Sequence, residues 1–167
     1  MLEKPRRFRV KRRRVAVAAV GVAKIQLDVN LSVKMELSME DKRFLEWICL
    51  KIRIHSCGAY RNTREGDIWW CSMGENVGVE INGKSEFFLR PVLIYKKLSK
   101  FGFMGIPLTS QPHMGSWYVK FIFQNKVEYG VLAQARVFSV FRLYRKMGAI
   151  SDSDFVVFRE SFRRLYC

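Results

Sequence analysis

Short apolar and alternating runs follow one another between residues 67 and 133, and they constrain the fold more than any other feature of the chain. Over 117–123 the residue types alternate, so that one face of a strand carries Trp117, Val119, Phe121 and Phe123. Further strands are expected over 67–73, 89–96, 101–108 and 127–133, with a long glycine-containing loop over 74–88. Short strands at this rhythm predict a small twisted β-barrel.

Helical periodicity precedes these strands. One apolar stripe is formed by Leu45, Ile48, Cys49 and Ile52. The helix that carries it is expected to begin at Ser38, which forms a pattern similar to a capping box with Asp41. Trp47, beside the stripe, is expected to pack in the core. The segment 57–64 is expected to be a linker.

Two more helices are expected after the strands. The segment 139–147 is predicted to be a short helix that ends at Gly148. A C-terminal helix is predicted to begin after Ser151, with an apolar stripe of Phe155, Phe158, Phe162 and Leu165. Arg159, Arg163 and Arg164 lie toward its negative end, where cations are favourable.

The chain is strongly basic. Its 167 residues hold 30 Lys and Arg against 15 Asp and Glu, a formal net charge of +15. Residues 1–38 hold ten basic and three acidic residues, which gives +7, and the rest of the chain contributes +8. A charge of this size favours a polyanionic partner, such as nucleic acid, an acidic protein or an anionic membrane surface.

The basic charge is densest near the N-terminus, where 5–14 has seven basic residues in ten and precedes the apolar run 15–23. This order imitates a secretory signal, but it also suits an RNA-attracting arm or a leader that a later start at Met39 omits. We expect residues 1–38 to be a basic leader outside the folded core, which adds charge but no chemistry. Residues 39–64 then form a helix and linker, and 65–167 form the main domain.

Cysteine usage and hydropathy indicate the compartment. The four cysteines include no Cys-x-x-Cys pair, and His55, Cys57 and Cys71 match no zinc spacing, so we expect reduced thiols and no metal site. No apolar run approaches the roughly 20 residues of a membrane span. A cytoplasmic protein without a membrane partner is expected.

Three ordered strings resemble the MazF/PemK family, the toxins of bacterial type II toxin–antitoxin pairs. They are Gly66-Asp67-Ile68-Trp69-Trp70, Arg90-Pro91-Val92-Leu93-Ile94 and Ile106-Pro107-Leu108-Thr109-Ser110-Gln111. Two shorter matches are Gly78-Val79-Glu80 and Gln134-Ala135-Arg136. The resemblance covers roughly residues 40–166. It implies an α+β fold, mainly β, with an SH3-like small barrel, a C-terminal helix and here an added N-terminal helix.

The resemblance also implies a function. Family members are endoribonucleases specific for single-stranded RNA, and they work as homodimers. A MazE-like acidic antitoxin neutralises them by placing a disordered tail in the RNA groove. Cleavage without a metal or other cofactor uses the ribose 2′-hydroxyl as nucleophile, and it leaves a 2′,3′-cyclic phosphate and a 5′-hydroxyl.

Four residues are candidates for this chemistry. Arg90 offers a planar fork of donors to phosphate oxygens and keeps its charge, so we expect it to stabilise the transition state and to assist the leaving oxygen. Thr109 at a strand end can donate its hydroxyl to a phosphate oxygen, and Ser110 can share that role. Glu80 matches the loop element of the family, where it would orient the 2′-hydroxyl or Arg90.

Other residues are candidates for RNA binding. The family resemblance implies Gln134 and Arg136, and the others follow because single strands are bound by aromatic faces beside positive charge. They are Arg136, Gln134, Lys84, Phe87, Phe88 and His113. Phe87 and Phe88 are expected to be an exposed pair at the end of the loop. Some PemK-type members have an acidic residue before the glutamine, and here Ala133 takes that place.

Two other functions fit the same sequence. A CcdB-like toxin has the same fold and acts on gyrase without cutting RNA, since fold does not determine function. A basic RNA-binding module without catalysis is the second alternative. Arg90, Pro91 and Thr109 favour the ribonuclease, because a gyrase-binding protein does not need them.

Overall fold

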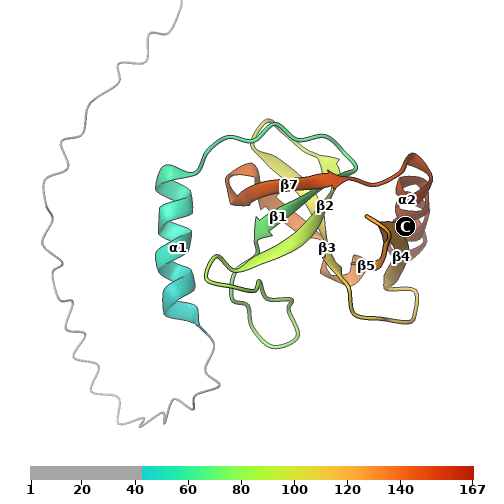
Figure 1. The fold of residues 1–167 in the computed structure, drawn as a ribbon, viewed down its shortest axis with the longest axis horizontal. Helices are drawn as coiled ribbons and strands as arrows, with labels where there is room; N and C mark the ends of the chain where they lie inside the picture. Colours follow the sequence, from blue (N-terminus) through green and yellow to red (C-terminus); the bar gives the residue numbers. More distant parts are fainter. Residues whose placement is uncertain (1–42) are drawn as a thin grey trace, which may run out of the picture. The chain divides into compact units, whose positions relative to one another are not determined.

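The computed structural model describes residues 43–167 (Figure 1). The basic leader 1–38, the start at Met39, and the pair Ser38 and Asp41 all lie outside this range. The described helices and strands are α1 Phe44–Cys57, β1 Asp67–Ser72, β2 Leu89–Lys97, β3 Gly102–Thr109, β4 Tyr118–Phe123, β5 Lys126–Val131, β6 Arg136–Ser139, β7 Leu143–Ala149 and α2 Asp152–Tyr166. Two one-turn 3₁₀ helices, η1 Leu132–Gln134 and η2 Val140–Arg142, flank β6.

The strands form one antiparallel system that turns at β3. The first half of β3 pairs with β6, and its end, Leu108 and Thr109, pairs with β5. One half of the sheet therefore runs β7-β1-β2-β3-β6, and the other runs β3-β5-β4. Because β3 belongs to both halves, the sheet folds over and encloses two separate cores. The predicted mainly-β architecture, with one helix before the strands and one after them, is confirmed.

The bend depends on Gly105 in β3. A Cβ at this position would lie 2.6 Å from Val92 Cγ1 and 2.9 Å from the ring of Phe138. The register between β2 and β3 also shifts just beyond this point. The close approach of three strands therefore requires a residue without a side chain at Gly105.

The helix predicted over 139–147 is wrong. This segment contains the end of β6, the single turn η2 and most of β7. β7 pairs with most of β1, from Asp67 opposite Ala149 to Cys71 opposite Leu143, with two register shifts between them. Pairing with β1 gives the backbone N–H and C=O groups along one edge of β7 their hydrogen-bond partners. This gain outweighs the local helical pattern. It also places Tyr144 and Arg145 on the sheet surface beside β1.

Helix α1 is attached to the barrel through Trp47. Its indole packs against Phe88, with 5.6 Å between ring centroids, and lies over Gly74. Gly74 has φ +100°, and a Cβ there would lie 2.4 Å from the indole. The predicted burial of Trp47 is confirmed. The predicted stripe does not pack against the barrel, because Leu45, Ile48, Cys49 and Ile52 are all exposed.

Helix α2 covers the other half of the sheet, beside β4 and β5 (Figure 1). Phe158 is fully buried against Phe121 and against Gly130, where a Cβ would lie 2.2 Å from the Phe158 ring. The predicted stripe of α2 is confirmed. The alternation of β4 also holds for Val119, Phe121 and Phe123, which are buried, but Trp117 is half-exposed.

The α2 cap gives a stability prediction. Ser151 is the N-cap, and its Oγ accepts a hydrogen bond from the Asp154 backbone N–H at 3.1 Å. Ser151→Ala is expected to lower the free energy of unfolding by about 0.5–2 kcal/mol, measured by urea denaturation. Ser116→Ala in an exposed loop is the control, and it is expected to change the free energy by less than about 0.5 kcal/mol. Equal effects of the two changes would contradict a capping role.

Candidate functional site

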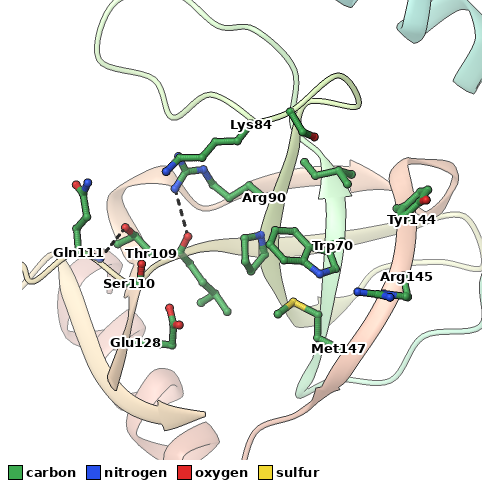
Figure 2. A pocket seen from close by; sticks show the side chains of 14 residues that line it. Trp70, Lys84, Arg90, Thr109, Ser110, Gln111, Glu128, Tyr144, Arg145 and Met147 are labelled. Carbon is green, nitrogen blue, oxygen red and sulfur yellow. Dashed lines mark hydrogen bonds between the residues drawn. The ribbon is translucent and has the colours of Figure 1, made fainter. Parts of the chain in front are cut away.

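Two adjoining hollows lie at the ends of β2 and β3. The larger has a volume of about 530 Å³ and is shown in Figure 2; the smaller has about 250 Å³. Four residues line both hollows: Lys84, Arg90, Thr109 and Gln111. Three of them, Lys84, Arg90 and Thr109, are candidates from the sequence, so the structure brings the principal predicted residues together.

The pairing of β2 with β3 explains why Arg90 and Thr109 meet. Val92 lies opposite Pro107 in this antiparallel pair. Counting two residues outward along each strand places Arg90 opposite Thr109. The start of β2 and the end of β3 therefore form one edge, where a cation and a hydroxyl lie side by side.

Arg90 is fixed by backbone acceptors. Its Nη1 donates to the carbonyl oxygen of Leu108 at 3.4 Å (Figure 2). Its Nε donates to the carbonyl oxygen of Asn82 at 2.8 Å. Both acceptors are neutral, and Arg90 takes part in none of the ion pairs found in residues 43–167. Burial lowers the pKa of Arg90. The guanidinium is thus held in place without a carboxylate, and its charge is available to an anion.

Two hydroxyl side chains, those of Thr109 and Ser110, line the larger hollow at the end of β3. Thr109 is half-buried, and its Oγ1 accepts from the Gln111 backbone N–H at 3.3 Å. This leaves the hydroxyl proton of Thr109 free to be donated to a ligand. Ser110 is exposed and lines the larger hollow.

Glu128 lines the larger hollow and is not among the residues expected from the sequence. It comes from β5, where Tyr129 lies opposite Thr109, so Glu128 neighbours Ser110 at the wall of the larger hollow (Figure 2). Burial raises the pKa of Glu128, and the Lys126 charge opposes that shift. Within the described range it forms no ion pair. The sequence does offer one signal for Glu128. It is a charged residue between Val127 and Tyr129, inside a segment that is expected to be a strand.

Aromatic faces border both hollows. Trp70 from β1 and Tyr144 from β7 line the larger one, together with Arg145. In the smaller one, His113 stacks on Tyr118 with 4.4 Å between ring centroids and 5° between the ring planes. Sequence reasoning missed Tyr144 and Arg145 because it assigned their segment to a helix.

Two predicted residues have structural contacts near the site. Gln134 lines the smaller hollow, but its Oε1 accepts from the Ile81 N–H and its Nε2 donates to the Val79 oxygen, both at 3.4 Å. Gln134 therefore braces the loop between β1 and β2. Glu80 lies in that loop, lines neither hollow and accepts from the Val77 N–H at 3.2 Å.

The remaining predicted residues lie elsewhere. The expected exposure of Phe88 is wrong: it is 1% exposed, because its backbone adopts φ +49° and its ring packs under Trp47. Phe87 is half-buried and stacks on Tyr144 with 5.7 Å between centroids. Arg136 lines neither hollow, and its Nη2 donates to the Met73 oxygen at 3.3 Å.

The described residues contain neither a cluster of metal ligands nor a helix that could span a membrane. No group of three His, Cys, Asp or Glu side chains in residues 43–167 is arranged to hold a metal ion. Of the former candidates, Cys57 is exposed on α1 and Cys71 is buried in β1. Neither described helix combines the length and apolar character required to cross a bilayer.

Comparison with solved structures finds similar chains. A mycobacterial endoribonuclease in complex with its cognate antitoxin has 11% identity and a TM-score of 0.49, with 62% of this chain and 93% of that chain covered. The Mycobacterium tuberculosis toxin MazF-mt6 has 15% identity and a TM-score of 0.47, covering 60% and 95%. An Mtb toxin has 18% identity and a TM-score of 0.40, covering 46% and 92%.

Comparison by sequence gives no match. No protein-family model matches the chain, and no curated protein matches it. Structural likeness at the identities above does not transfer chemistry from one chain to another. The chemical assignment therefore depends on the residues of the two hollows.

Proposed function

We propose that this protein is a MazF/PemK-type toxin, an endoribonuclease that cleaves single-stranded RNA without a metal ion. The observation that carries the proposal is the unneutralised guanidinium of Arg90, held beside Thr109 and Lys84 where two hollows meet. A phosphodiester bridging the hollows would find a fork of donors, a hydroxyl donor and a second cation.

The proposed reaction begins with attack of the 2′-oxygen on the adjacent phosphorus. The bond from phosphorus to the 2′-oxygen forms while its bond to the 5′-oxygen breaks, giving a 2′,3′-cyclic phosphate and a 5′-hydroxyl. Negative charge on the phosphoryl oxygens is greatest in the transition state. Arg90, Lys84 and Thr109 stabilise that charge from fixed positions, which requires little reorganisation during the reaction.

Two protons must move in the same step. Glu128 is the carboxylate in the larger hollow, and in its ionised form it accepts the proton of the 2′-hydroxyl. The Arg90 guanidinium keeps its proton and hydrogen-bonds the 5′-oxygen as that oxygen leaves, and water supplies the proton of the new 5′-hydroxyl. In this scheme Glu128 supplies a carboxylate to a chain that has Ala133 at the position where some PemK-type members have an acidic residue.

Aromatic and charged surfaces support RNA as the substrate. Trp70 and Tyr144 offer faces for a base in one hollow, and the His113–Tyr118 stack offers one in the other. Unpaired bases stack on such faces, whereas a duplex keeps its bases inside. The two hollows, which share the cations Lys84 and Arg90, also suit the acidic tail of a MazE-like antitoxin. A cytoplasmic homodimer is part of the proposal.

The test uses the full chain, a long single-stranded RNA and excess EDTA. Discrete cuts with 5′-hydroxyl and cyclic phosphate ends are expected. A copy of the strand with 2′-deoxy residues at the mapped cut sites is the control, and it is expected to bind and stay intact because it lacks the nucleophile. Intact RNA in the first reaction, with binding retained, would overturn the enzyme assignment in favour of a binding module. Cutting of the deoxy strand would overturn the 2′-hydroxyl mechanism.

A further inference from the structure

A second cationic pocket lies apart from the two hollows. Its volume is about 210 Å³, and three of its lining residues are basic: Lys51 from α1, Arg136 from β6 and Arg142 from η2. None of the residues that line it is acidic. Three separate elements therefore each contribute a positive charge to this pocket. The local sequence around each residue does not show that the three charges meet.

The two arginines converge on one backbone oxygen. Arg136 Nη2 donates to the Met73 oxygen at 3.3 Å, and Arg142 Nη1 donates to the same oxygen at 3.4 Å and to the Ser72 oxygen at 3.1 Å. Aromatic rings hold the guanidiniums as well, since Arg142 lies 5.2 Å from the Trp47 ring centroid and Arg136 lies 5.1 Å from that of Phe138. The cations are positioned, with further N–H donors left over.

Their charge is not neutralised by nearby groups. Burial and the Arg142 charge both lower the pKa of Arg136. Glu80 opposes this effect from the loop, but it forms no ion pair with either arginine in the described part of the chain. Burial raises the pKa of the Cys71 thiol to about 12, so it carries no charge near neutral pH. Two half-buried like charges without a counter-ion are unfavourable unless an anion joins them.

We propose that this pocket binds a phosphate group, and that its source is the backbone of the single strand whose cleaved phosphate lies at Arg90. The size of the pocket suits a compact anion, and guanidinium forks match phosphate oxygens. The RNA source depends on the proposed function, whereas the phosphate site itself does not.

The loop 74–88 connects the two sites. Asn76 lines the cationic pocket, and its backbone N–H donates to Asn82 Oδ1 at 2.7 Å. The carbonyl of Asn82 accepts from Arg90 Nε. In the proposed arrangement the strand passes this loop between the two sites, and we therefore expect a short strand to occupy the Arg90 site alone.

Lys51→Glu tests the proposal without removing an arginine that supports the fold. Lys51 is exposed, and a carboxylate there would give both arginines an internal partner. Arg53→Glu is the matched control, because it makes the same charge change two residues along α1 and outside this pocket. The probes are 2′-deoxy strands of about 4 and about 16 nucleotides, together with inorganic pyrophosphate.

We expect Lys51→Glu to weaken binding of the longer strand about tenfold, to reduce the salt slope by about one, and to leave the short strand unchanged. It should also reduce the rise in Tm that pyrophosphate gives, while Arg53→Glu keeps both responses. Unchanged affinity for the longer strand, or equal losses for both lengths, would overturn the second site. If pyrophosphate binds the wild-type protein but neither strand does, the nucleic-acid source and the proposed function fail while the phosphate pocket stands.

Discussion

Arg90→Ala is expected to lower the rate of RNA cleavage by about 100- to 1000-fold, the effect of removing one fixed donor to a developing oxyanion. The side chain is held by the carbonyls of Asn82 and Leu108, and it has no carboxylate partner in the described residues. In the proposed reaction its full charge faces the phosphate, so their attraction grows as negative charge develops on the phosphoryl oxygens. The measurement is the single-turnover rate with RNA in excess EDTA.

Two further variants separate a specific role of Arg90 from general loss of charge. Arg90→Lys keeps the charge without the fork and should fall between alanine and the wild type. Arg145→Ala removes a cation from the same hollow, on β7, and is expected to reduce the rate much less. A wild-type rate in Arg90→Ala, or equal losses in Arg90→Ala and Arg145→Ala, would contradict the assignment. Urea unfolding of each variant checks the fold.

Glu128→Gln is expected to lower the cleavage rate by about 100- to 10,000-fold, the range for loss of a general base. In the wild type the rate should rise with pH through the pKa of Glu128, because only the ionised carboxylate accepts the 2′-hydroxyl proton. Since burial raises that pKa, the rise should lie above the range of an ordinary glutamate. The variant should lose this rise, which a pH–rate profile measures.

Stability provides an independent control for Glu128. Its pKa is raised in the folded state, so its contribution to stability is complete below the unfolded pKa and is lost as pH rises through the folded pKa. Glu128→Gln should therefore be at least as stable as the wild type at neutral pH, and slow cleavage cannot then come from unfolding. Glu80→Gln is the matched carboxylate control outside both hollows. A full rate in Glu128→Gln, or an equal loss in Glu80→Gln, would contradict Glu128 as the base.

The sequence by itself determined the elements whose pattern is complete within one segment. Alternation predicted β4, the apolar run predicted β2, and the stripe with its cap predicted α2. It also placed Arg90 and Thr109 at strand ends and made them candidates, and the structure finds both lining the same two hollows. These features depend on local periodicity and on neighbouring residues, and both can be read from the sequence.

The tertiary structure alone decided which segments meet. It made β7 a strand through pairing with β1, and it buried Phe88 beneath Trp47. It brought Glu128 beside Ser110, and it moved Arg136 to a separate pocket. Each outcome depends on a partner distant in the chain, because pairing and burial gain free energy from contacts that local propensity does not contain.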